Sequence, residues 1–313
     1  MVELGGLIKH YRDVLNALYG GGGRAFIGKV IEELDRCWGS ANVFILEAPT
    51  GYGKTAVSLT IAKYSVEEEL KAVVAYPLRT LLEQQVEVFR KLFKACGLGE
   101  GLVGVRYMMN AESPYFVRPA TLTTVDTLAL TTLGIAPEDL GKALASATGK
   151  PTWGSMGHYV FSWASTFTSN IVIDEAHLLA DSGKAISFIS FLAKEAVLHD
   201  QHLIVMTATL PQTLVKAVEA AVGWRGSGRI RTLSFTNYAL RDGGEGDPFI
   251  MERLSKEYVV ETMPVEGGDG VKAAVEWLES VCGRWGGPQR VLAVFNRLPR
   301  RWRPTGWPSR SSP

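Results

Sequence analysis

The most constraining feature of the sequence is a glycine-containing loop between an apolar run and a helical segment. Ala48-Pro-Thr-Gly-Tyr-Gly-Lys-Thr55 directly follows the run 43–46 and leads into a segment with helical spacing at 54–70. Glycines allow backbone N–H groups to surround a phosphate at the positive end of the following helix. Lys54 would reach the β- and γ-phosphates, and the Thr55 hydroxyl would ligate Mg²⁺. The loop thus predicts a nucleotide site at Thr50, Gly51, Tyr52, Gly53, Lys54 and Thr55, with a structural glycine turn as the alternative.

Strand-length and helix-length segments alternate along the chain. Apolar runs lie at residues 43–46, 72–76, 103–107, 120–124, 171–173, 203–206 and 290–295. Segments with helical spacing lie at 54–70, 80–95, 183–199, 211–222 and 271–282. Most of the apolar runs are continuous, as expected for strands that are buried on both faces of a parallel sheet. We therefore expect an α/β fold with a doubly wound parallel sheet.

Changes in composition divide the chain into five parts. We expect an N-terminal helical segment at 1–23, which ends in a glycine run, and a first complete α/β domain at 24–240. Residues 241–256 contain Gly, Asp and Pro and are expected to form a linker. A second α/β domain starts at 257–296, and residues 297–313 are an irregular tail rich in Arg, Trp, Pro and Ser. Only 18 residues follow the run 290–295, so we expect the second domain to be truncated.

Composition excludes several classes of protein. The three cysteines are far apart and indicate neither a disulfide framework nor a zinc site. No apolar stretch of about 18 residues occurs, which predicts a cytoplasmic protein without a membrane span. The formal net charge of +1 gives no overall basic field, so nucleic acid would have to bind to a local patch.

A second chemical signal is Asp174-Glu-Ala-His177, directly after the run 171–173. Asp174 would hold Mg²⁺, and Glu175 would orient and deprotonate the water that attacks the γ-phosphate. Acidic residues also cap strand ends and start helices, so the tetrapeptide alone is weak evidence. Lys54 and Asp174 both follow apolar strands, however, at the edge where doubly wound sheets bind ligands. Together they predict ATP hydrolysis with Lys54 and Glu175 as catalytic residues.

Five blocks in order carry a resemblance to a known family: residues 48–55, 76–85, 123–128, 174–177 and 207–211. They resemble motifs I, Ia, Ib, II and III of the superfamily 2 helicases, and most resemble the CRISPR-associated helicase of type I interference systems. The resemblance covers about residues 40–215. It implies a RecA-like domain of the P-loop NTPase class, with ATP and Mg²⁺ as cofactors, that moves on single-stranded DNA in antiviral defence.

The resemblance also assigns roles to residues outside the nucleotide loop. It implies that His177, Thr207 and Thr209 couple hydrolysis to domain movement. It further implies that four residues line the nucleic-acid path: Arg79, Thr80, Thr124 and Asp126. Single strands are bound mostly through backbone phosphates by side chains and helix N-termini, which suits these positions. The alternatives are a helix start after Pro77 and a helix cap at Thr124.

Some features of the family pattern are missing, and they leave other interpretations open. No His-Asp dyad precedes the helicase blocks, so the resemblance implies a separate HD nuclease subunit beside the CRISPR interference complex. Residues 24–40 contain no glutamine, so the preferred base is open, and motifs V and VI do not follow Asn296. A DEAH-type RNA helicase and a non-catalytic nucleotide- or nucleic-acid-binding remnant are the alternatives.

Other histidines and a group of aromatic residues carry weaker signals. His10, His158, His199 and His202 have no metal-ligand spacing. Between the third block (123–128) and the fourth (174–177) lie four aromatic residues, Trp153, Phe161, Trp163 and Phe167, and we expect them to serve in packing before base stacking.

Overall fold

The computed structural model describes residues 6–108, 110–134, 148, 157–179, 182–223, 228–241, 247–255, 275–277 and 279–280. The chain divides into two compact units, Met1–Ser255 and Lys256–Pro313. The predicted strand 290–295 and tail 297–313 lie outside the described residues. Of the predicted helix 271–282, the described residues 275–277 and 279–280 are helical. The elements below belong to the first unit.

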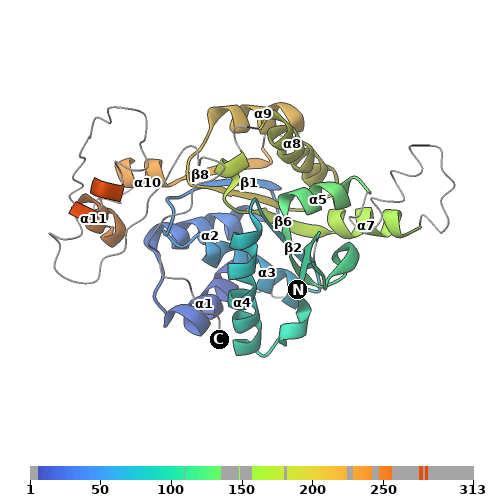
Figure 1. The fold of residues 1–313 in the computed structure, drawn as a ribbon, viewed down its shortest axis with the longest axis horizontal. Helices are drawn as coiled ribbons and strands as arrows, with labels where there is room; N and C mark the ends of the chain where they lie inside the picture. The colour runs from blue at the N-terminus through green and yellow to red at the C-terminus, as the bar shows by residue number, and fades with distance from the viewer. Residues whose placement is uncertain are drawn as a thin grey trace. The chain divides into compact units, whose positions relative to one another are not determined.

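One sheet organises the first unit (Figure 1). Its strands are β1 (Val43–Glu47), β2 (Lys71–Tyr76), β3 (Val103–Tyr107), β4 (Asn110–Ala111), β5 (Ala120–Thr124), β6 (Ser169–Ile173), β7 (Leu203–Thr207) and β8 (Ile230–Ser234). They lie in the order β4-β3-β5-β2-β6-β7-β1-β8. Seven are parallel, and the two-residue β4 is antiparallel to β3. The prediction of an α/β fold with a doubly wound parallel sheet is confirmed, apart from this short antiparallel edge.

Helices cover both faces of the sheet (Figure 1). One face carries α1 (Leu7–Tyr19), α2 (Ala25–Cys37), α3 (Thr55–Glu67) and α4 (Arg79–Ala95). The other carries α5 (Val125–Thr132), α8 (Gly183–Leu198) and α9 (Gln212–Val222), with α7 (Gly157–Phe167) beside α5. Two short helices, α10 (Phe235–Arg241) and α11 (Pro248–Leu254), add aromatic side chains to the first face. Single turns of 3₁₀ helix lie at Glu100–Leu102, Pro114–Phe116 and Ala176–Leu179.

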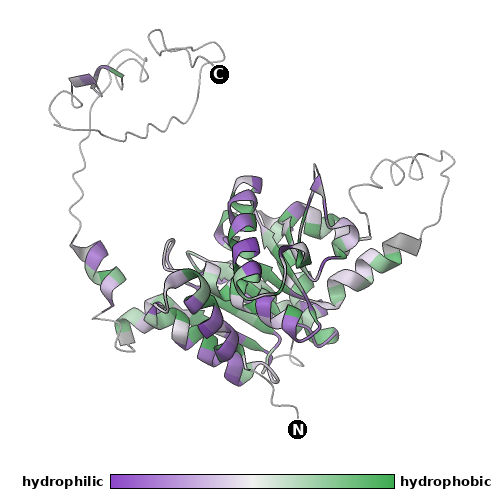
Figure 2. Cartoon of the chain, turned by 90° about the horizontal axis from the view of Figure 1, so that it is seen from below, coloured by the Kyte–Doolittle hydropathy of each residue, from purple (hydrophilic) through white to green (hydrophobic). Residues whose placement is uncertain are grey.

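Alternate strand residues supply the two cores. Phe44 and Leu46 of β1 pack in the core with α1–α4, whereas Val43 and Ile45 pack in the core with α8 and α9. All four are essentially inaccessible to solvent. Figure 2 shows hydrophobic residues concentrated in the sheet and hydrophilic residues on the outer sides of the helices. Burial on both faces explains why the strand sequences are continuously apolar.

Several details differ from the sequence prediction, and one is that residues 248–254 of the expected linker form helix α11, whose Phe249 lies in the core of the first face. The strand β8 was not predicted, because its residues Ile230–Ser234 are only half-buried at the sheet edge and the segment therefore lacks a continuous apolar run. The helix α1 packs against α3 and shares the core of the first face, so the glycine run after it does not separate it from the α/β layer. No helix among the described residues has the length and hydropathy needed to cross a membrane.

Candidate nucleotide-binding site

The strand order brings three loops to one edge of the sheet. The strand β7 lies between β1 and β6, and all three are parallel. The loop after β1 contains Lys54, the loop after β6 contains Asp174, and β7 ends at Thr207. Because the carboxyl ends of parallel strands share an edge, residues more than 100 positions apart become neighbours.

The loop after β1 has the backbone conformation that its glycines permit. Gly51 and Gly53 have φ angles of 82° and 104°, a region that residues with a Cβ rarely adopt. Helix α3 begins at Thr55, immediately after Lys54. The loop therefore ends at the positive end of a helix, where backbone N–H groups are available to an anion.

The Lys54 ammonium group is buried beneath this loop. The residue is 5% exposed, and its Nζ donates hydrogen bonds to the carbonyl of Ala48 at 3.0 Å and of Pro49 at 3.4 Å. Its Nζ also lies 3.6 Å from Oε1 of Glu175. The structure thus brings together the two side chains that the sequence predicted as catalytic.

Asp174 and Glu175 form an acidic pair whose charges are differently exposed. Asp174 is 5% exposed, and its Oδ1 accepts a 2.8 Å hydrogen bond from the Glu175 N–H. Burial and the neighbouring Glu175 charge raise the pKa of Asp174 to about 6, although Lys54 opposes the shift. Glu175 has φ 53°, a strained value for a residue with a side chain, and it is held in contact with Lys54 and His177.

His177 connects the acidic pair to the end of β7. Its Nδ1 lies 3.3 Å from Oε2 of Glu175 and 3.4 Å from the backbone N of Ala208. An Nδ1 without a hydrogen accepts the Ala208 N–H, whereas an Nδ1 that carries a hydrogen donates to Glu175, so this nitrogen serves one partner at a time. Next to it, the Thr207 hydroxyl donates a 2.5 Å hydrogen bond to the Thr209 carbonyl. The Thr207 carbonyl accepts the Ala48 N–H at 3.0 Å, which joins β7 directly to the loop of residues 48–55, called the phosphate loop below.

The residues predicted to hold Mg²⁺ offer suitable atoms. Thr55 and Asp174 provide a hydroxyl and a carboxylate, and Mg²⁺ prefers such oxygen ligands, completed by water and substrate phosphates. The raised pKa of Asp174 indicates a buried negative charge that is incompletely compensated, which a divalent cation would offset. In the described part of the chain, no group of three His, Cys, Asp or Glu side chains forms a metal site by itself. The donor set therefore fits a cation shared with a bound nucleotide.

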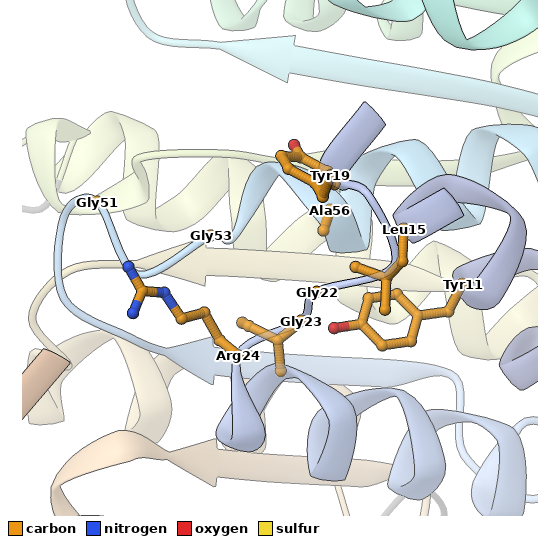
Figure 3. Close-up of a pocket in the computed structure, with 10 residues that line it drawn as sticks. Tyr11, Leu15, Tyr19, Gly22, Gly23, Arg24, Gly51, Gly53 and Ala56 are labelled. Carbon is orange, nitrogen blue, oxygen red and sulfur yellow. The ribbon is translucent and has the colours of Figure 1, made fainter. Parts of the chain in front are cut away.

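A cavity of about 410 Å³ lies beside the phosphate loop (Figure 3). It is lined by Tyr11, Leu15, Tyr19, Gly22, Gly23, Arg24, Ile27, Gly51, Gly53 and Ala56. Figure 3 shows the Arg24 guanidinium extending toward the loop that contains Gly51 and Gly53. The sequence did not predict that Tyr19 and Arg24 line this cavity. The one sequence signal close to them is the glycine run between α1 and α2.

Two of the six predicted loop residues contact α11. Tyr52 is fully buried, its ring packs against Phe26, Phe235 and Phe249, and its backbone N–H donates to the Pro49 carbonyl. The Tyr52 side chain is thus part of the core rather than of the cavity. Thr50 is exposed, and its carbonyl accepts a 3.4 Å hydrogen bond from Arg253 of α11.

The four residues predicted for nucleic acid lie at the same sheet edge, and two of them, Arg79 and Thr124, have structural partners. Arg79 and Thr80 begin α4 after β2, and Thr124 and Asp126 lie where β5 meets α5, with Tyr76 and Thr124 paired in register. Arg79 is ion-paired with Glu83 at 2.8 Å and lies over the ring of Tyr107. The Thr124 hydroxyl accepts the Thr127 N–H at 3.4 Å, so Thr124 caps α5 as the alternative interpretation expected.

Most of the aromatic and histidine residues outside the main motifs contact other side chains of the fold. Phe167 is 6% exposed, whereas Phe161 and Trp163 are 51% and 42% exposed on α7. His202 stacks on Trp38 with ring centroids 3.7 Å apart, and His10 and His199 lie beside Glu67 and Glu195. The positions of Trp153 and of the His158 side chain lie outside the described residues.

Comparisons with known proteins agree with this arrangement. A DEAD/DEAH box helicase family model matches residues 29–217, which is more than half of the chain. The DUF1998 helicase MrfA bound to DNA and AMPPNP is 14% identical with a TM-score of 0.51, covering 72% of this chain and 29% of MrfA. Cas3 of T. fusca with AMPPNP is 12% identical with a TM-score of 0.51, covering 69% of this chain and 24% of Cas3. At these identities the structures support the fold alone, and the chain spans less than a third of either protein. Comparison with curated protein sequences gives no match.

Proposed function

Since the chain belongs to the DEAD/DEAH box helicase family, we propose that it binds and hydrolyses ATP at the sheet edge around Lys54 and uses the energy to move on nucleic acid. The observation that carries the proposal is the convergence of Lys54, Asp174 and Glu175 beside a glycine loop at a helix N-terminus. Phosphoryl transfer depends mainly on positioning and on stabilisation of charge, and this arrangement provides both.

Each residue of the site has a distinct part in the proposed reaction. Lys54 exchanges its loop carbonyl partners for the β- and γ-phosphates and neutralises their charge. Glu175, which is partly exposed, orients the attacking water and accepts its proton. Thr55 and Asp174 would hold Mg²⁺, which neutralises developing charge on the phosphate oxygens when bound. The cavity lined by Tyr19 and Arg24 takes the base and ribose of the nucleotide.

The contacts of β7 give the proposed motor a route from chemistry to movement. The Ala48 N–H and Thr207 carbonyl join the phosphate loop to the segment that contains Thr207 and Thr209. His177 lies between Glu175 and Ala208, so a change at the γ-phosphate that moves Glu175 would alter the bond to Ala208. A bistable contact of this kind is what coupling between a site and a domain movement requires.

Single-stranded DNA is the nucleic acid that we propose as the partner, with Arg79, Thr80, Thr124 and Asp126 on its path. The structure of MrfA contains bound DNA. The amino-acid sequences of the motifs in this chain resemble those of the CRISPR-associated helicase. We extend the proposal to antiviral defence with a CRISPR interference complex and a separate HD nuclease subunit, and to the cytoplasm. The exposed Arg79 at a helix start is suited to a backbone phosphate.

The test compares ATP hydrolysis by the purified chain alone, with single-stranded DNA and with single-stranded RNA of the same sequence. Hydrolysis that requires Mg²⁺ and is stimulated more by DNA supports the proposal. Greater stimulation by RNA favours the RNA helicase alternative. Nucleotide binding with no turnover under any condition supports the interpretation as a non-catalytic remnant.

A further inference from the structure

Tyr52 is an aromatic anchor inside the phosphate loop. It stands between Gly51 and Gly53, both with positive φ, yet it is fully buried. Its hydroxyl donates to Oδ2 of Asp247 and accepts the Phe26 N–H at 3.2 Å. Burial raises the pKa of Tyr52, so the hydroxyl keeps its proton for this bond. The loop is thus tied, between its two glycines, to a residue 195 positions away.

The residue at the other end of this bond also starts a helix. Asp247 is 5% exposed, and its Oδ1 accepts the Phe249 N–H at 2.9 Å, which caps α11. Phe249 packs edge-on against Tyr52 with ring centroids 5.1 Å apart. Arg253 lies over Phe249 and donates to the Thr50 carbonyl at 3.4 Å. The short helix α11 therefore contacts the phosphate loop through both Thr50 and Tyr52.

This arrangement bears on the nucleotide because the loop backbone supplies the phosphate ligands. Glycine on either side of Tyr52 leaves the backbone free to adopt other conformations unless the tyrosine side chain is held. Ordering of a loop costs conformational free energy, and a loop that is ordered before binding does not incur that cost when the ligand arrives. The Tyr52 anchor is positioned to provide this order.

We propose that Asp247 is a positioning residue for the nucleotide site: by holding Tyr52 it keeps the phosphate loop in its binding conformation, so nucleotide binding and docking of α11 stabilise each other. The inference rests on the proposed function, which supplies the nucleotide. Linkage is reciprocal, so a loop stabilised by α11 implies a helix stabilised by nucleotide. The chain passes from α11 into the second unit at Lys256, so this helix is the segment through which the linkage would continue.

The first experiment measures the affinity for Mg²⁺-ADP by calorimetry in the wild type, Tyr52→Phe, Asp247→Asn and the double variant. Asparagine still caps a helix, and phenylalanine keeps the ring packing, so each change is directed at the Tyr52–Asp247 bond. Loss of a buried bond to a charged group predicts about tenfold weaker binding for each single variant. Because both act through one bond, the double variant should bind no more weakly than the weaker single variant.

A matched control removes a buried hydrogen bond of α3 that lies away from the phosphate loop. The Ser65 hydroxyl accepts a 2.9 Å hydrogen bond from Asn170, near the start of β6 and so at the amino-terminal ends of the strands. Ser65→Ala should therefore lower the melting temperature and leave ADP affinity unchanged. If Tyr52→Phe and Asp247→Asn behave in the same way as Ser65→Ala, the bond serves the fold alone and the inference is overturned. If the wild-type chain binds no ADP, the proposed function fails, and this inference fails with it.

A second experiment needs no variant. Hydrogen exchange of the wild-type chain is measured with and without saturating Mg²⁺-ADP, and the linkage predicts up to about tenfold slower exchange of the amides in α11. Exchange in α11 that is unchanged by ADP, while exchange in the phosphate loop slows, would overturn the inference. This comparison decides the question even where a substituted chain does not fold.

Discussion

The Lys54 ammonium lies 3.6 Å from the Glu175 carboxylate, so the group expected to bind phosphate is paired with the group expected to act on water. Both side chains are largely removed from solvent, with 4% of Lys54 and 20% of Glu175 exposed. Arrival of the γ-phosphate would compete with Glu175 for Lys54 and free the carboxylate for water. The pair is thus a resting arrangement that a nucleotide would open.

Lys54→Ala should weaken Mg²⁺-ATP binding by about 10- to 100-fold, because the phosphates lose a charge-assisted partner that the backbone amides only partly replace. Calorimetry measures the effect. Lys91→Ala, an exposed lysine on α4, provides the control and should bind ATP as the wild type does. Equal ATP affinity in Lys54→Ala and wild type would contradict the assignment of the phosphate loop.

Glu175→Gln should leave nucleotide binding nearly intact and lower turnover by about 10²- to 10⁴-fold, since it keeps the shape of the side chain and removes the base. The Glu175 charge raises the pKa of the neighbouring Asp174 carboxyl, and this substitution removes that charge. Binding of Mg²⁺-ATP should therefore not weaken. Steady-state hydrolysis and calorimetry on the same preparation separate the two effects. Turnover equal to that of the wild type would assign the base to another residue.

Asp174→Asn should stabilise the nucleotide-free chain above pH 6. The folded-state pKa of Asp174 is raised from 3.8 to about 6, so the folded form holds its proton more tightly than the unfolded form. The contribution of this group to stability is present below about pH 4 and is lost as the pH rises to about 6, by about 3 kcal/mol. Asparagine avoids the loss.

Urea unfolding in Mg²⁺-free buffer tests this prediction. The free energy of unfolding of Asp174→Asn should exceed that of the wild type by about 1–3 kcal/mol at pH 7.5, and the difference should shrink toward pH 4. The same variant should bind Mg²⁺-ATP more weakly, since a neutral amide is a poorer ligand for Mg²⁺. A difference in stability that is the same at both pH values would show that Asp174 does not titrate in this range.

Arg79→Ala should weaken binding to single-stranded DNA without changing ATP affinity. The slope of log affinity against log salt concentration should become shallower by about one, as expected for the loss of one phosphate contact. Arg36→Ala is a matched control, because Arg36 is exposed on α2 and paired with Glu33 as Arg79 is with Glu83. Affinity measured over a salt series distinguishes the two variants. If both lower DNA affinity equally, Arg79 has only its structural role beside Glu83 and Tyr107.

The sequence predicted the sheet and the main side chains of the site because both depend on short segments. Strands β1, β2 and β7 are buried on both faces, and their continuous apolar runs marked them within one or two residues. The motifs at Lys54 and Asp174 follow such strands, so the shared edge of the parallel sheet placed them together. Only the strand order, which depends on contacts across the whole chain, brought Lys54 within reach of Glu175.

The features that the sequence did not reveal depend on side chains that are distant along the chain. Nothing in the local pattern around Asp247 indicates that it reaches Tyr52, because the bond exists only once α11 packs on the aromatic cluster. The cavity beside Arg24 likewise requires α1 and α2 to meet the phosphate loop. A helix cap at Thr124, which the structure has, and the proposed contact of Thr124 with nucleic acid would produce the same sequence signal, so the pattern alone did not separate them.

The last prediction concerns the base of the nucleotide: ADP and GDP should bind with affinities within about tenfold of each other. The polar side-chain groups among the residues that line the cavity are the hydroxyls of Tyr11 and Tyr19 and the Arg24 guanidinium. A hydroxyl both donates and accepts, so it can pair with the edge of either purine. Strong rejection of the wrong base requires a fixed polar group that is left unpaired by it, and the residues that line the cavity include no side-chain amide or carboxylate of that kind.

Tyr19 supplies the matched test of this cavity. Tyr19→Ala should weaken ADP and GDP binding by a similar factor, because a ring face stacks on any purine, whereas Tyr19→Phe should retain both affinities. Calorimetric titration of each variant with both nucleotides gives the ratio directly. A preference for ADP greater than about 100-fold would show that a base-reading group outside this lining contacts the nucleotide, whereas unchanged affinity in Tyr19→Ala would place the base elsewhere than in the cavity.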